Sequence, residues 1–318
     1  MPPRTTPRRS VPPIAVASLI TAAACWGLGT VASKQAVDDV APLTLLPMQL
    51  TASWAFLLVL ALMRRQTFSW TPPMRRLSVL GVINPGIAYA LGLVGLTTIS
   101  ASMSVLLWAL EPVAIVLLAA LVLREHIPLG LAVSLGFAVT GALLVVYQPG
   151  ATGDVRGITL TVVSIGFCAV YTVLTRVLLL DDSSSMVVLA QQVAALAFAV
   201  VLATVVALLG GTGWDADGLA SPGVWLAAGT SGVLYYGLGF TFYLAGLRQV
   251  PASYAGAFLT LIPAFGVAAG YLTGDRLDPR QWAGATVIVL STVVIALREP
   301  HADPGARPQA RAKPSNRG

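Results

Sequence analysis

The sequence predicts an all-α membrane protein whose ten transmembrane helices form a 5+5 inverted-topology repeat. Three observations support this class. Hydrophobic residues make up 56% of the 318 residues and charged residues only 10%, whereas soluble domains carry about 25% charged residues. Apolar runs of about 20 residues, the length that crosses a bilayer, recur along the chain. The second half of the chain also repeats features of the first.

The apolar runs follow one another with short polar connections. They lack the strand-like alternation of membrane barrels, so each run is predicted to be a helix that satisfies its own backbone hydrogen bonds in lipid. The first run is too long for a signal peptide, and we expect it to be retained. The expected helices cover residues 14–33, 43–63, 77–98, 100–123, 129–147, 157–178, 185–209, 223–247, 250–273 and 281–297.

Basic residues set the expected orientation. With the N-terminus inside, 15 of the 19 Lys and Arg residues lie inside and 4 outside, and such an excess is typical of cytoplasmic loops. We therefore expect a multi-pass protein of the bacterial cytoplasmic (inner) membrane with both termini cytoplasmic. This bias also accounts for the net charge of +6, so the lipid bilayer is an expected partner and nucleic acid is not.

An internal repeat divides the chain. Sliding residues 81–132 by 151 positions gives 14 identities in 52 positions, including Pro112 with Pro263, and the earlier helices match at an offset of 142, including Gln49 with Gln191. Because each unit has an odd number of helices, the second copy is inverted, as in many secondary transporters with a midplane site between the halves. The predicted segments are a cytoplasmic tail (1–13), two five-helix repeats (14–147 and 157–297) and a disordered cytoplasmic tail (298–318).

Short motifs inside this pattern resemble a known family. The residues that carry the resemblance are Trp26-Gly27 with Lys34, the run from Gly95 through Ala101-Ser102 to Pro112 and Glu125, and its echo at Gly246, Ala252-Ser253 and Pro263. Over about residues 14–297 the chain resembles the EamA-type transporters of the drug/metabolite transporter superfamily. The resemblance implies a ten-helix carrier, commonly an exporter of amino acids, metabolites or drugs.

Glu111 is the only acidic residue deep inside an apolar run, and its repeat partner is Ile262. A charge at the bilayer centre costs roughly 2.5–3.5 kcal/mol on insertion scales and usually faces a cavity or a partner. One interpretation is a group that exchanges a coupling proton or binds a substrate amine. The alternative is a protonated strut, hydrogen-bonded to a neighbouring helix.

Polar and aromatic residues in the other spans complete the candidate site. Helical spacing places Ser104, Trp108 and Glu111 on one face, so Trp108 can contact an amine through its ring or simply pack. For the aromatic residues packing is the alternative, and for the two glutamines it is a lock between helices. Prolines beside the site either break their helices or fix kinks. The further candidates are Trp26, Gln49, Asn84, Tyr89, Gln191, Tyr236, Phe240 and Tyr254, with helix breaks at Pro85, Pro112 and Pro263.

The sequence lacks the patterns of an enzyme. It has no HExxH, no GxSxG and no pair of intramembrane aspartates, and its two histidines, His126 and His301, fall in a loop and in the tail. We therefore expect no catalytic residue, metal or cofactor. The expected function is a secondary transporter, a monomer or homodimer, that exports a small amine-bearing or amphipathic metabolite by alternating access, with a proton as one candidate for the coupling ion. The alternatives are an uptake carrier and a non-transporting membrane sensor.

Overall fold

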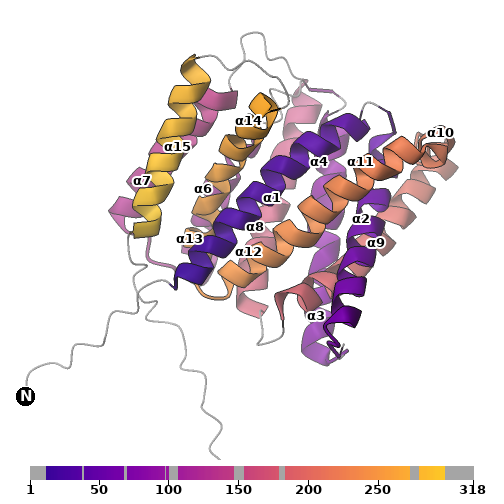
Figure 1. The fold of residues 1–318 in the computed structure, drawn as a ribbon, viewed down its shortest axis with the longest axis horizontal. Coiled ribbons are helices and arrows are strands. Elements are labelled where there is room, and N and C mark those ends of the chain that lie inside the picture. The colour runs from indigo at the N-terminus through magenta and orange to yellow at the C-terminus, as the bar shows by residue number, and fades with distance from the viewer. Residues whose placement is uncertain are drawn as a thin grey trace, which may run out of the picture.

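The computed structural model describes residues 12–37, 39–67, 70–96, 98–99, 107–146, 154–178, 183–272 and 279–297, which form a bundle of helices (Figure 1). Within these ranges, six helices are long and apolar enough to cross a membrane: Pro13–Thr30, Pro42–Met63, Pro72–Gly95, Val155–Leu178, Ser184–Leu208 and Pro279–Leu297. Shorter apolar helices run over Glu111–Leu123, Leu129–Val145 and Ala252–Gly266. The all-helical class is therefore confirmed.

The elements follow the expected runs closely. The first half contains α1 (Pro13–Val37), α2 (Pro42–Met63), α3 (Pro72–Gly81), the π-helical η1 (Val82–Ile87), α4 (Ala88–Leu96), α6 (Glu111–Leu118), the π-helical η2 (Ala119–Leu123) and α7 (Leu129–Val146). The second half contains α8 (Val155–Leu178), α9 (Ser184–Leu208), α10 (Ala216–Ala220), α11 (Pro222–Gly232), the π-helical η3 (Val233–Gly239), α12 (Phe240–Leu247), α13 (Ala252–Ala257), the 3-10 helix η4 (Phe258–Leu261), α14 (Ile262–Leu272) and α15 (Pro279–Leu297).

Polar residues in the connections start the helices. The hydroxyl oxygens of Thr71, Ser183 and Ser221 accept hydrogen bonds from the backbone N–H groups of the first turns of α3, α9 and α11. A side-chain oxygen at this position satisfies a backbone donor that has no partner within the helix. Proline opens the first turn of α2, α3 and α11, where its missing N–H costs no helical bond.

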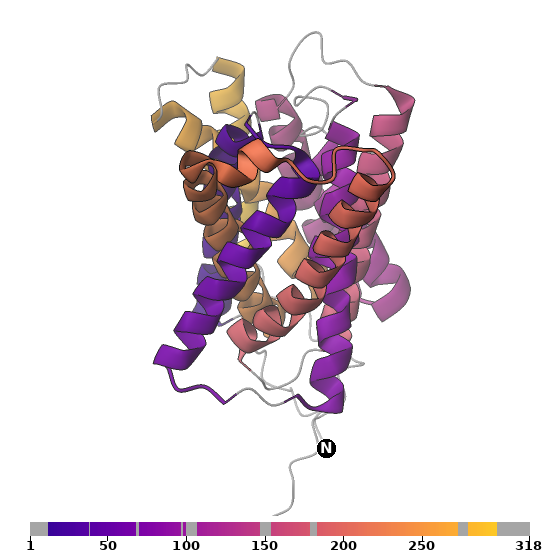
Figure 2. The same ribbon diagram turned by 90° about the vertical axis from the view of Figure 1, so that its right-hand side faces the viewer.

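The two halves interlock through reciprocal contacts. α1 packs against α11, α12 and α14 of the second half, and α8 packs against α3, α4 and α6 of the first. α2 and α9 pack together on the face that Figure 2 turns toward the viewer, and α7 and α15 lie side by side at the opposite edge in Figure 1. Residues from both halves therefore meet in the interior of the bundle.

Two glycines allow a close approach between the halves. A Cβ atom at Gly81 would overlap the backbone of Gln191, and a Cβ atom at Gly232 would overlap the backbone of Gln49. Both the glycines and the glutamines are matched pairs of the internal repeat. The same close backbone contact thus occurs twice, once with the glycine in the first half and once with the glycine in the second. Only glycine fits at these positions.

π-Helical turns occur at matched places in the two halves, at η1 and η3. In η1 the backbone of Asn84 is extended (φ −147°, ψ 121°), so the helix is broken there. In η3 the helix continues without such a break. The first half therefore carries an irregular backbone where the second half is regular.

Asp215 ties the connection before α10 to the connection after α1. Its carboxylate accepts hydrogen bonds from the backbone N–H groups of Gly218 and Ala41, at 3.0 and 3.2 Å. These two donors favour the charged form and hold the pKa of Asp215 below its usual value. The contact joins the two halves at the end of the bundle where α10 lies (Figure 1).

Candidate functional site

A small cavity lies where the two halves meet. The described residues that line it come from α1, η1, α4 and α6 of the first half and from α8, η3, α12, η4 and α14 of the second. The free volume of the cavity is about 20 Å³, which is room for about one water molecule. A metabolite therefore requires the surrounding helices to move apart. The lining residues are Trp26, Asn84, Tyr89, Glu111, Tyr171, Thr172, Tyr235, Phe240, Tyr243, Leu259 and Ile262.

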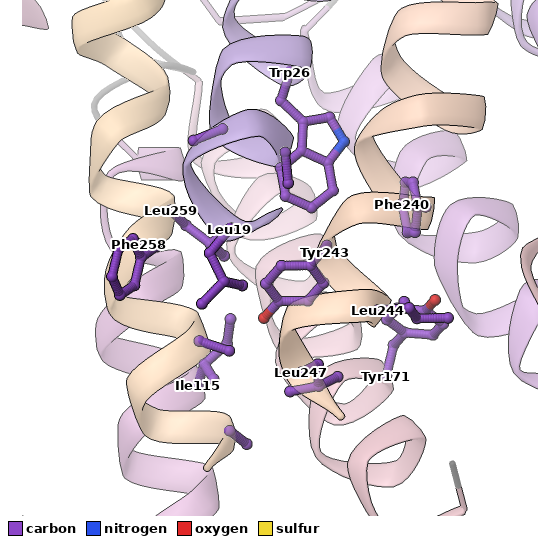
Figure 3. Packing of buried hydrophobic residues seen from close by; sticks show 14 of the residues in the cluster. Leu19, Trp26, Ile115, Tyr171, Phe240, Tyr243, Leu244, Leu247, Phe258 and Leu259 are labelled. Carbon is purple, nitrogen blue, oxygen red and sulfur yellow. The ribbon is translucent and has the colours of Figure 1, made fainter. Parts of the chain in front are cut away.

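Aromatic rings form much of the cavity wall. The ring of Trp26, on α1, meets Phe240 edge-on at a centroid distance of 5.4 Å and lies 5.3 Å from Tyr243. Figure 3 shows the indole next to Tyr243, with Phe240 beside them. Tyr171, on α8, also packs against Phe240, with a distance of 5.8 Å between the ring centroids. Such edge-to-face contacts fix the rings and leave π faces available to a cation.

A hydroxyl pair joins the two halves at the cavity. The hydroxyl groups of Tyr89, on α4, and Tyr235, in η3, are 2.9 Å apart, and their rings meet at 89°. Trp108 stacks on Tyr89 at 5.9 Å and an interplanar angle of 21°. Trp108 is not among the lining residues, so it supports Tyr89 from behind.

Glu111, at the first position of α6, is the only charged residue among the described residues that line the cavity. Within the described part of the chain it forms no hydrogen bond and no ion pair. The described residues of the lining include no Lys, Arg or His. The carboxyl group therefore faces the cavity without a compensating donor from the described residues.

Asn84 reaches the cavity from the broken part of η1. Its side chain is 5% exposed, and its Oδ1 atom has no hydrogen-bond partner among the described residues. Buried acceptors are normally paired, so an unpaired one at a cavity calls for an explanation.

The two glutamines hold the scaffold and lie outside the cavity lining. Gln49 donates hydrogen bonds from Nε2 to the hydroxyls of Ser33 and Ser231, at 2.9 and 2.8 Å, and so links α1, α2 and α11. Gln191 accepts a hydrogen bond from the hydroxyl of Tyr171 at 2.9 Å. Gln191 thus orients a side chain of the cavity wall without lining the cavity itself.

The remaining predicted residues are spread around the cavity. Tyr254 donates to the carbonyl of Ile295, at 2.9 Å, and packs toward α15. Tyr236 packs on the rings of Tyr89, Tyr235 and Phe240 but is not a lining residue. The prolines fall in η1 (Pro85), directly after Glu111 (Pro112) and in α14 (Pro263), and Ser104 lies outside the described residues.

Six lining residues were not among the predicted site residues: Tyr171, Thr172, Tyr235, Tyr243, Leu259 and Ile262. The repeat offset of 151 pairs Tyr235 with Asn84, so the internal repeat held a signal for that residue. Tyr243 follows Phe240 in an aromatic stripe on α12. Tyr171 and Thr172 lie in α8, where the small polar residues Thr161, Ser164, Thr172 and Thr175 recur at helical spacing and are all buried, so this stripe was a signal for the inward face.

The fold and the cavity together define a multi-pass helical membrane protein built from two interlocked halves around a central, mainly aromatic cavity. The sequence profile of the EamA-like transporter family matches residues 13–147 and 155–297, that is, two copies that cover most of the chain. The chain belongs to the EamA-like transporter family.

A solved structure supports the fold independently. Its title reads only "Crystal structure of protein". It is 18% identical to this chain, covers 88% of this chain and 95% of its own, and superposes with a TM-score of 0.73. At this identity the likeness concerns the fold alone. No curated protein matches the chain significantly.

Proposed function

We propose that the chain is a secondary transporter that exports a small amine-bearing metabolite across the bacterial cytoplasmic membrane by alternating access. The observation that carries this proposal is the position of Glu111, whose carboxyl group lies in an aromatic cavity with no basic residue among the described residues of its lining. A membrane carboxylate usually faces a partner or a pathway, and aromatic rings attract cations. A substrate ammonium supplies the missing partner.

The proposed arrangement has ten membrane helices in two inverted five-helix repeats, 14–147 and 157–297, with both tails (1–13 and 298–318) in the cytoplasm. The reciprocal packing of α1 and α8 supports an inverted repeat. So does Figure 1, in which α1 begins and α15 ends at the same end of the bundle. The excess of basic residues assigns that end to the cytoplasm.

Alternating access fits the size of the cavity. In the proposed cycle, this closed form with a cavity of about 20 Å³ lies between two open forms. Each open form exposes Glu111 to one side of the membrane. Rocking of one repeat against the other around a fixed site is the usual movement in inverted-repeat carriers. The broken helix at Asn84 gives the first repeat a place to bend.

In the proposed cycle, a proton and the substrate amine compete for Glu111, and this competition couples their movements. The inward flow of protons sets the direction of amine transport. A carboxyl group that has bound a proton no longer attracts an ammonium group, so the two cations bind in turn. If the protein can change sides only with one of them bound, inward proton flow drives amine export. Glu111 is then the residue at which the two fluxes are exchanged.

The test is flux in proteoliposomes with phenethylamine as the probe and protein-free vesicles as the measure of passive leak. The wild-type protein should accelerate counterflow of the amine and of protons, with a marked pH dependence. Glu111→Gln should abolish the fluxes of the amine and of protons, because the amide cannot ionise, while the amount of protein in the membrane stays normal. Glu111→Asp should keep part of the activity with a shifted pH optimum. The matched control is Asp217→Asn, which neutralises an exposed carboxylate in α10.

Wild-type rates and wild-type pH dependence in the Glu111→Gln protein would refute the proposed role and leave Glu111 as a structural residue. Saturable amine binding without any flux would instead indicate a membrane sensor.

A further inference from the structure

We propose that Asn84 and Glu111 together form a subsite for an ammonium group that carries N–H donors, so that the protein selects primary amines over quaternary ammonium compounds. This inference rests on the proposed function and adds the class of amine to it. The juxtaposition that carries it is two acceptors, from η1 and from α6, that line the same cavity without a donor among the described residues.

Two acceptors of the cavity lack a donor among the described residues, and the indole N–H of Trp26 and the hydroxyl of Tyr243 lack a partner in the same lining. Asn84 Oδ1 is buried and has no donor among the described residues, and within the same ranges the Glu111 carboxyl group forms no hydrogen bond. The hydroxyl of Tyr89 donates to that of Tyr235, and the hydroxyl of Tyr171 donates to Gln191. The unpaired donors of Trp26 and Tyr243 form no hydrogen bond to Asn84 or Glu111. A ligand that pairs the two acceptors therefore brings its own donors.

The internal repeat shows that this arrangement is not imposed by the scaffold. The residues equivalent to Asn84 and Glu111 at the offset of 151 are Tyr235 and Ile262, and all four line the cavity. The first half therefore contributes an amide and a carboxyl group where the second half contributes an aromatic ring and an aliphatic side chain. At these two matched positions the cavity is polarised, because the acceptors come from the first half and the aromatic and aliphatic surface from the second.

This polarity specifies the shape of the ligand. A primary ammonium group has three N–H donors, which can be shared between the carboxylate and the amide oxygen. A quaternary ammonium group has the same charge and suits the aromatic rings equally well, but it would leave Asn84 Oδ1 unpaired. The apolar wall with Tyr235 and Ile262 then receives the body of the molecule, so the preferred ligand is an amphipathic primary amine.

The experiment compares three matched probes on the full chain in detergent by isothermal titration calorimetry: phenethylamine, its N,N,N-trimethyl derivative and phenethyl alcohol. We expect the primary amine to bind at least about tenfold more tightly than the trimethyl compound, because one hydrogen bond to a charged group is lost. The alcohol, which has no charge, should bind most weakly. Glu111→Gln should weaken both cations and leave the alcohol unchanged.

Asn84→Leu removes the acceptor at similar volume and should weaken the primary amine to the level of the trimethyl compound, whose own affinity stays the same. Asn84→Ser, which keeps a short acceptor, should retain part of the preference. Gln249→Leu is the control, since it removes an amide on the exposed surface after α12. The probe series on the wild-type protein gives an answer even where a variant does not fold.

Equal binding of the two cations by the wild-type protein would overturn the inference, as would an unchanged preference in a folded Asn84→Leu protein. In both cases Glu111-dependent binding of amines would leave the proposed function standing. If neither cation binds, or if Glu111→Gln changes the affinity of neither, the proposed function fails together with the inference.

Discussion

Glu125 and Ser253 join the two repeats at the end of the bundle where α13 begins. The carboxylate of Glu125 accepts hydrogen bonds from the backbone N–H and the hydroxyl of Ser253, and from the backbone N–H of Ala252 at 2.8 Å. It thereby pairs two of the backbone donors that have no partner at a helix N-terminus. A residue of the first half thus caps a helix of the second.

Replacing Glu125 should destabilise the protein. Glu125→Ala leaves the donors of Ala252 and Ser253 without their acceptor, and we expect the free energy of unfolding to fall by about 1–2 kcal/mol. Glu125→Gln should cost less, because the amide keeps one acceptor oxygen. Thermal unfolding in detergent measures the effect, with Asp217→Ala as an exposed control. A melting temperature of Glu125→Ala equal to that of the control would show that the cap contributes nothing.

The close approach between the halves at Gly232 can be tested within one helix. Gly232→Ala places a methyl group against the backbone of Gln49, and overpacking of this kind costs about 1–3 kcal/mol. Gly229→Ala, also in α11, meets nothing within 4 Å and should be neutral or slightly stabilising. The measurement is the yield of monodisperse protein together with its melting temperature. Equal behaviour of the two variants would contradict the proposed contact.

The hydrogen bond between Gln49 and Ser231 should be measurable as a coupling between α2 and α11. A double-mutant cycle with Gln49→Leu, Ser231→Ala and the combined variant is expected to give an interaction energy of about 0.6 kcal/mol, the average for such bonds between membrane helices. Unfolding in mixed detergent micelles gives the four stabilities. An interaction energy of zero would mean that the two residues stabilise the bundle independently.

The orientation of the chain is open to a direct test. Reporters fused after Gly318 and inserted in the stretch from Gly210 to Gly218 should report cytoplasm and periplasm, respectively, because the basic residues favour a cytoplasmic C-terminus. Paired alkaline phosphatase and fluorescent-protein fusions give opposite signals on the two sides. A periplasmic C-terminus would rule out the ten-helix arrangement in this orientation.

The sequence by itself determined the class of the protein and singled out the carboxyl group that lines its central cavity. Apolar runs of bilayer length leave helices as the only stable form for a backbone in lipid. The lone carboxyl group of Glu111 could be found because a charge in such a run is costly and therefore rare. The internal repeat was also visible as matched residues such as Pro112 and Pro263.

Only the tertiary structure decided which side chains meet. Gln49 and Gln191 are equivalent in the sequence, yet one binds two serines and the other orients Tyr171. Asn84, Glu111, Tyr235 and Ile262 line one cavity because helices distant in sequence pack together there. In a soluble helix, a polar face identifies the buried face opposite. In lipid most positions on both faces are apolar, so a helix such as α8 marks its inward face only by a few small polar residues, and its neighbours decide which side chains it meets.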